Sequence, residues 1–534
     1  MQANNDDTSH RSEAKTRQQA AASGTSSPKP PDDDRRLKIF IAAVVIGLLA
    51  LFVVMWFRAR GPLQSKERVG AACFHAMFAR DFDQAIAMFR EFRELAEEDI
   101  PPEVRDEFMA LTADRFQQTY PIYPREANPH QLWKTVSGSQ FARAAFEGAT
   151  TAQDFALAAL RYVRINMQAD PTPIEEQPVL LDPVELLHRG YGDSLQMSWV
   201  MAHLLRNGGL DAAVGYLPAS DDEPDYGIVG VVIDRRMYLF DPFRGVPLCR
   251  AADGRVADLE SLLSGEHELV PGFGGPGSPV RLDRLRRAAF FVPADSSNVT
   301  PDAWLLDLIF KGGGWHNFIY RPVTRDIRQI GAAVFGDGAR LRQPRGNYWV
   351  LLDEESELRV GLWPFPFLVD QAKSDPQYAD RLVQAYPHAP LVWDVRSAQL
   401  LRDKELNKAV RERYAELRDR HEDNPEFLED LTFFSTRLAS YPGEQAGLLA
   451  GYLEDYPDGR WRPLATMMRA ELEAQSGRGD VARGLTARIE PPSPYALRAR
   501  LLEQVVAQQP TGRAIIRWQF PETDDEQTSP EPAR

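Results

Sequence analysis

The stretch from residue 186 to residue 246 holds the side chains best placed to do chemistry. A Gly-Tyr-Gly-Asp turn ends at Asp193, and an amphipathic segment begins at Ser194. A serine hydroxyl is a useful nucleophile only when a neighbouring base takes its proton, so the chemistry would be hydrolysis or acyl transfer. His188, just before the turn, is a candidate for that base. Serine and aspartate are also favoured where a helix begins, because they accept hydrogen bonds from its first N–H groups. We favour this second interpretation, a capped helix start.

The elements around Ser194 are predicted to be one helix followed by strands. The helix is expected to end at residues 207–209 (Asn-Gly-Gly), since glycine after an apolar periodic segment is typical of a helix C-terminus. Three β-rich runs follow, at residues 212–217, 228–233 and 237–240. The last run leads directly into Asp241. One helix combined with consecutive strands predicts the α+β fold class.

This layout resembles the core of the transglutaminase-like, papain-type cysteine hydrolase superfamily, over roughly residues 150–245. In that family a nucleophilic cysteine opens a helix after a glycine-rich turn, and the next strands supply a histidine and an aspartate. Residues 206–209 (Arg-Asn-Gly-Gly) and 238–242 (Tyr-Leu-Phe-Asp-Pro) are similar to two sequence motifs of that family. The resemblance implies a helix packed on an antiparallel sheet.

The catalytic positions implied by the resemblance have lost two of their three residue types. Ser194 stands where the family has its cysteine, and Tyr226, fifteen residues before Asp241, stands where it has its histidine. A thiolate is a good nucleophile because an imidazole lowers its pKa, whereas a phenol with a pKa near ~10 is a poor base at neutral pH. We therefore predict a pseudoenzyme in which Ser194, Tyr226 and Asp241 are degenerate triad positions. The alternative is an active hydrolase or acyl transferase that uses Ser194 with a base from elsewhere.

A membrane anchor is predicted near the N-terminus. Residues 39–57 are 19 consecutive residues with no polar side chain except the indole of Trp56. At 1.5 Å per residue this segment is about 28 Å long, close to the ~30 Å hydrocarbon core of a bilayer. Its length exceeds the apolar core of a signal peptide (roughly 7–15 residues), and it ends in Met-Trp-Phe at residues 55–57 rather than in small residues. We expect a single-pass protein of the cell membrane, in contact with the lipid bilayer through residues 39–57, with its bulk on the extracytoplasmic side.

The rest of the chain divides by composition and periodicity. The predicted parts are a disordered tail at 1–36, a transmembrane helix at 37–58, a helical hairpin at 62–118, a transglutaminase-like α+β domain with a β-rich extension at 119–366, a helical domain at 367–507, and a C-terminal tail at 508–534 that is acidic and disordered at its end. The hairpin and residues 448–490 each resemble a tetratricopeptide unit, so the helical domain is expected to be repeat-like.

Composition excludes several classes of function. The net charge of −15 argues against nucleic acid as a partner, since phosphate binding needs clustered lysine and arginine. Two cysteines, Cys73 and Cys249, rule out a disulfide framework, although one bond between them stays open. The nine histidines show no metal-binding spacing, and the glycine-rich stretches at 272–279 and 312–315 lack the features of phosphate loops. We expect neither metal nor cofactor.

The combined features favour a non-catalytic function. A fold that once held a peptide substrate would now serve as a binding or scaffolding module for a protein or peptide at a membrane surface, an inference by analogy. A third class, an assembly factor whose partner binds only the helical domain at 367–507, differs in where it places that partner.

Overall fold

The computed structural model describes most of the chain after residue 60. The described residues are 61–112, 129–170, 182–219, 223–270, 279–294, 299–315, 319–335, 341–342, 350–352, 359–363, 399–401, 404–509 and 512–521. The N-terminal tail and the apolar segment at 39–57 lie outside them, so the membrane anchor stays a prediction. Within the described helices, none is both long enough and apolar enough to span a bilayer.

An eight-stranded sheet lies at the centre of this α+β protein, in the order β6-β5-β4-β3-β7-β10-β9-β8. The strands are β3 (Asp211–Leu217), β4 (Tyr226–Ile233), β5 (Arg236–Asp241), β6 (Val246–Pro247), β7 (Ala289–Pro293), β8 (Leu341–Arg342), β9 (Val350–Leu352) and β10 (Arg359–Trp363). Neighbours are antiparallel from β6 to β7, and β7 pairs with β10 in parallel. The three predicted β-rich runs are confirmed as β3, β4 and β5.

In β3, β4 and β5 the last residue of each strand pairs with the first residue of the next strand. Leu217 pairs with Tyr226 across the β3–β4 connection, and Ile233 pairs with Arg236 across a two-residue turn. In that turn Asp234 and Arg235 have φ angles of 51° and 63°. Positive φ at both turn positions matches the right-handed twist of a hairpin, which explains why so short a connection is tolerated.

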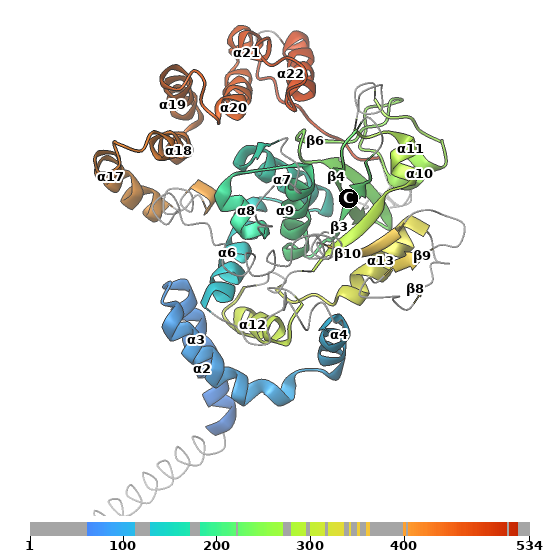
Figure 1. The fold of residues 1–534 in the computed structure, drawn as a ribbon, viewed down its shortest axis with the longest axis vertical. Coiled ribbons are helices and arrows are strands. Elements are labelled where there is room, and N and C mark those ends of the chain that lie inside the picture. The colour runs from blue at the N-terminus through green and yellow to red at the C-terminus, as the bar shows by residue number, and fades with distance from the viewer. Residues whose placement is uncertain are drawn as a thin grey trace, which may run out of the picture. The chain divides into compact units, whose positions relative to one another are not determined.

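Helix α9 (Ser194–Asn207) is the most enclosed element of the fold. All of its residues are buried, and it packs on β3 and β4 (Figure 1). Its other sides contact α6 (Pro129–Ala145), α7 (Ala152–Asn166) and α8 (Pro183–Arg189). The approach of β4 is so close that a methyl group on Gly227 would lie 2.5 Å from the carbonyl oxygen of Ser194. Only glycine permits this contact.

A buried ion-pair network holds the C-terminal end of α9. Arg206 Nη1 lies 2.5 Å from Asp326 Oδ2, and both side chains are at most 1% exposed. Arg321 binds the other oxygen of Asp326 at 3.1 Å and donates to the carbonyl of Leu210 at 2.8 Å. Asp326 and Arg321 belong to α13 (Val323–Phe335) and to the segment just before it. Cations near a helix C-terminus stabilise its free carbonyl groups, so this network fixes where α9 ends.

The N-terminal helices form a separate apolar cluster. They are α2 (Gly61–Phe78), α3 (Phe82–Ala96), η1 (Glu97–Asp99) and α4 (Pro102–Thr112), and α12 (Pro301–Gly312) packs among them. A short turn separates α2 from α3: Arg80 has a φ of 60°, and the side chain of Asp81 caps α3 by accepting from Gln84 N at 3.1 Å.

The described C-terminal part is helical. Its elements are α17 (Lys404–Arg420), α18 (Pro425–Ser435), η3 (Thr436–Leu438), α19 (Pro442–Asp455), α20 (Arg462–Gln475), α21 (Gly479–Thr486) and α22 (Ala496–Gln508). Trp461, 1% exposed, stacks on Phe433 at 4.8 Å between ring centroids. Residues 456–461 separate α19 from α20, and residues 476–478 separate α20 from α21.

The C-terminal helical part contacts α7, β1 and the eight-stranded sheet. Tyr162 Oη of α7 donates to the carbonyl of Leu400, and Tyr495 Oη accepts from Ala169 N at 2.9 Å in β1 (Gln168–Ala169), which pairs with β2 (Tyr191–Gly192). The segment after α22 returns to β5, where Phe520 packs edge-on against Tyr238 at 5.0 Å. The described residues 512–521, in the region predicted as a tail, therefore contact the sheet.

Candidate functional site

The structure brings together Ser194, Tyr226 and Asp241, the three residues predicted to be degenerate triad positions. Ser194 is the first residue of α9, Tyr226 the first of β4 and Asp241 the last of β5. Tyr226 Oη donates to the carboxylate of Asp241, at 3.0 Å from Oδ1 and 2.9 Å from Oδ2. Ser194 Oγ accepts a hydrogen bond from Gly227 N at 3.0 Å. The backbone of Gly227 thus joins the serine to the tyrosine–aspartate pair.

This cluster is closed to solvent. Ser194 and Tyr226 are each 6% exposed, and Asp241 is fully buried. The carboxylate also accepts from Arg244 N at 3.0 Å, and Arg244 Nε lies 3.8 Å from it. A buried carboxylate with these donors is satisfied without any imidazole.

The protonation states follow from burial. Burial, reinforced by the charge of Asp241, raises the pKa of Tyr226 well above its ordinary value. Burial also raises the pKa of Asp241, against the opposing effect of Arg244. Tyr226 is therefore a hydrogen-bond donor at neutral pH, and it cannot take a proton from Ser194.

The residue that caps α9 is Asp193 rather than Ser194. The Asp193 side chain accepts from Gln196 N at 2.8 Å, and Gln196 Oε1 accepts from Asp193 N at 3.2 Å, which completes a capping box. The predicted capped helix start is confirmed. Since the cap uses the aspartate, the serine hydroxyl is left to bind Gly227 across the helix–strand contact.

No described histidine forms a hydrogen bond with Ser194 Oγ. The ring of His188 packs between Trp133 and Phe141, each at 5.3 Å between ring centroids. His203 Nε2 lies 2.9 Å from Asn207 Nδ2, at the opposite end of α9 from Ser194. His316 lies outside the described residues. The described contacts thus place no base at the serine.

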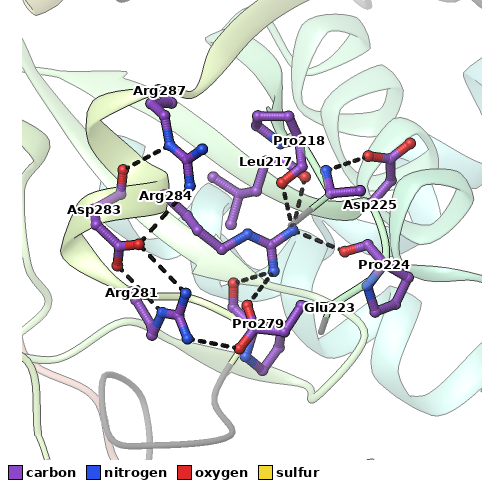
Figure 2. Close-up of polar contacts among 11 residues, drawn as sticks. Leu217, Pro218, Glu223, Pro224, Asp225, Pro279, Arg281, Asp283, Arg284 and Arg287 are labelled. Atoms are coloured by element: carbon purple, nitrogen blue, oxygen red, sulfur yellow. Dashed lines mark hydrogen bonds and ion pairs between the residues drawn. The ribbon is translucent and has the colours of Figure 1, made fainter. Parts of the chain in front are cut away.

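A buried arginine fixes the segment that leads into Tyr226. Arg284, a fully buried residue of the short helix α11 (Leu282–Arg286), reaches the connection between β3 and β4 (Figure 2). Its guanidinium donates five hydrogen bonds of 2.8–3.0 Å, to Glu223 Oε2 and to the carbonyl oxygens of Leu217, Pro218, Pro224 and Pro279. Arg281 binds the other oxygen of Glu223 at 3.0 Å.

This arginine positions Tyr226 at the end of the connection it holds. Leu217 at the end of β3 and Pro224, two residues before β4, are bound by one nitrogen of the same planar group, so they cannot separate without losing several bonds together. Sequence reasoning missed Arg284, because its partners are carbonyl oxygens that no residue type signals. Only the acidic side chain of Glu223 could have pointed to it.

The two cysteine thiols are buried and unreactive at neutral pH. Cys73 and Cys249 are both free and buried, so the open question of a disulfide is answered. Burial raises the pKa of each thiol to about 12, so both remain protonated at neutral pH. Among the described residues, no group of three or more His, Cys, Asp or Glu side chains is arranged to hold a metal ion.

Replacing Tyr226 by Phe is expected to reduce the free energy of unfolding by about 1–3 kcal/mol at about pH 8, because the buried carboxylate of Asp241 loses a donor. The folded phenol has a raised pKa, so above about pH 10 the unfolded chain releases this proton first. The advantage of the natural chain over the variant must then shrink as pH rises. Urea unfolding at about pH 8 and about pH 10.5 measures it. A constant or growing advantage would contradict the assignment, and Tyr441→Phe, at a residue 64% exposed, is the control.

Replacing Arg284 by Met is expected to cost about 3 kcal/mol or more, since Glu223 and four carbonyl groups lose a buried charged donor. Arg287→Met, at a side chain 44% exposed beside the same helix, should cost less than about 0.5 kcal/mol. Urea unfolding compares the two, and limited proteolysis should detect new cleavage between β3 and β4 in the first variant alone. Equal effects of the two substitutions would show that the clamp does not hold this connection.

In comparisons with known proteins, no protein-family model, no curated protein and no solved structure matches the chain. The features that bear on function are therefore the geometry of Ser194, Tyr226 and Asp241 and the sequence itself.

Proposed function

We propose that this chain is a membrane-anchored binding or scaffolding protein, with a transglutaminase-like domain at 119–366 that does not catalyse. The observation that carries the proposal is the hydrogen bond from Tyr226 to Asp241, at the position where such an enzyme needs an imidazole. A phenol held by a carboxylate stabilises the fold, but it cannot activate a nucleophile.

The surroundings of Ser194 support the same proposal. Its hydroxyl oxygen accepts from the backbone of Gly227, and the residue is 6% exposed. A nucleophile must reach the carbonyl carbon of its substrate, with reacting atoms about 3–3.5 Å apart. A serine enclosed between a helix and a strand gives no such access, so its role is to join α9 to β4.

A protein or peptide partner fits the surface better than a small substrate at this cluster. Six large hydrophobic side chains of the described residues are exposed. Four of them lie in the C-terminal part: Tyr441, Leu448, Val481 and Ile515. Helical repeat-like regions bind other proteins through such surfaces, so we place the partner on the helical domain at 367–507.

Assays of peptide hydrolysis and amine incorporation with the full chain, beside a Ser194→Ala variant, test the absence of catalysis. We expect no turnover by either chain. Turnover by the natural chain that Ser194→Ala abolishes would overturn the proposal in favour of a hydrolase or acyl transferase with a recruited base. Binding activity is assessed separately, by crosslinking partners to the natural chain and to a variant that lacks residues 404–508.

Membrane attachment is tested by fractionation. The full chain should remain in the membrane pellet after extraction at alkaline pH, and a variant lacking residues 37–58 should be released. Protease added to intact cells should digest the bulk of the chain if it lies on the extracytoplasmic side. Release of the full chain by alkaline extraction would contradict the anchor, and protection from protease would contradict the orientation.

A further inference from the structure

A cavity of about 660 Å³ lies where α7 meets the C-terminal helices. It is separate from the cluster at Ser194 and independent of the function proposed above. Its walls come from α7, α17, α19, α20 and the segment around η3. This volume falls within the range of pockets that hold small organic molecules.

The walls of the cavity carry a strong excess of positive charge. Five of the lining side chains are cationic and one is anionic, Glu471. The cations are Arg161, Arg164, Lys408, Arg411 and Arg437. The whole chain has a net charge of −15, so this concentration of cations runs against its overall composition. Like charges gathered around one space repel each other, and an anion in that space would relieve the repulsion.

Three of these cations have an acidic partner among the described residues. Arg411 pairs with Glu444 at 3.3 Å, and Lys408 lies 4.0 Å from Glu412 with both side chains largely exposed. Arg164 pairs with Glu471 at 3.4 Å, but the same carboxylate also binds Arg498, at 2.7 Å. One carboxylate therefore serves two arginines.

One arginine of the wall has a donor that the described residues leave unused: Arg164 Nε is buried and forms no hydrogen bond with any of them. Arg498, which does not line the cavity but shares Glu471 with Arg164, is fully buried, and its Nη1 and Nη2 also form no hydrogen bond with a described residue. Burial, together with the charges of Arg498 and Arg161, lowers the pKa of Arg164 to about 10. Burial alone would raise the pKa of Glu471, but the two arginines hold it below its ordinary value. This charge imbalance beside the cavity is costly unless an anion completes it.

The cavity also has an apolar side. Ile165, Met468 and Leu472 line it, and Tyr441 at its edge is 64% exposed. Arginine forks bind phosphate and carboxylate groups with the same paired geometry, and an aromatic edge suits a planar organic body. We propose that this cavity binds a small organic anion, of about mononucleotide size, through a phosphate or carboxylate group.

Isothermal titration calorimetry of the full chain at physiological salt tests the proposal, with adenosine monophosphate and citrate as probes. Saturable binding of one or both is expected. Binding of the nucleotide alone identifies phosphate as the recognised group, and binding of citrate alone identifies carboxylate. Absence of saturable binding of both probes would overturn the proposal.

Variants locate the binding. Arg164→Gln should weaken binding about tenfold or more, because it removes a charged donor from the cavity wall. Glu471→Gln, which removes the competing carboxylate, should strengthen it. Arg483→Gln, at a side chain 49% exposed on α21 and outside the cavity, should leave it unchanged. If thermal unfolding shows that Arg164→Gln does not fold, the double variant Arg161→Gln/Lys408→Gln replaces it. Affinity unaffected by the cavity variants, or weakened equally by Arg483→Gln, would overturn the proposal.

Discussion

The complete burial of α9 is the constraint on which the rest of the described structure depends. A helix leaves unpaired N–H groups at its first turn and unpaired carbonyl groups at its last turn. In a buried helix these groups cannot form hydrogen bonds with water. The chain meets this need at both ends, with the Asp193–Gln196 capping box at the first turn and with Arg321 at the last. Asp326 balances Arg321 and Arg206 together, which ties α13 to the same helix. The sheet contributes the hydrogen bond from Gly227 to Ser194. Helix, strands and covering elements are thus positioned by the polar groups of one helix.

The sequence predicts the local elements of this arrangement well. Glycines after Asn207 mark the end of α9, and the β-rich runs before Asp241 give β3, β4 and β5, because turn chemistry and apolar patterning act within short windows. The positions of Ser194, Tyr226 and Asp241 come from a resemblance, and the structure brings them together. Their bonds were not predictable. Which of Asp193 and Ser194 caps the helix depends on the distance between Ser194 and Gly227. The packing of α9 against β4 sets that distance.

Long-range polar contacts mark the limit of sequence reasoning. Arg284 binds carbonyl oxygens up to 67 positions away, and Glu471 meets one arginine from α7 and another from α22. No periodic pattern signals such partners, since arginine is usually a surface residue. The two buried arginine sites nevertheless differ in kind. At Arg284 both terminal nitrogens of the guanidinium, Nη1 and Nη2, find oxygen acceptors, as in a structural clamp, and only Nε has no partner among the described residues. Around Glu471 the donors outnumber the described acceptors, which is typical of a site that receives its acceptor from outside.

The return of the chain end to the sheet has a mechanical consequence. Gln519 O accepts from Val256 N at 2.8 Å, and Phe520 packs on Tyr238 and Phe240. The helices from α17 to α22 are therefore attached to the sheet domain at both of their ends. Before α17, Leu400 contacts α7, and after α22, Phe520 contacts β5. A tension applied beyond residue 521 would load β5 first and reach the helices only after that contact broke. The helical part is fixed to the sheet domain at both ends rather than at one. A force applied to it by a bound partner would therefore act on β5, the strand that ends in Asp241.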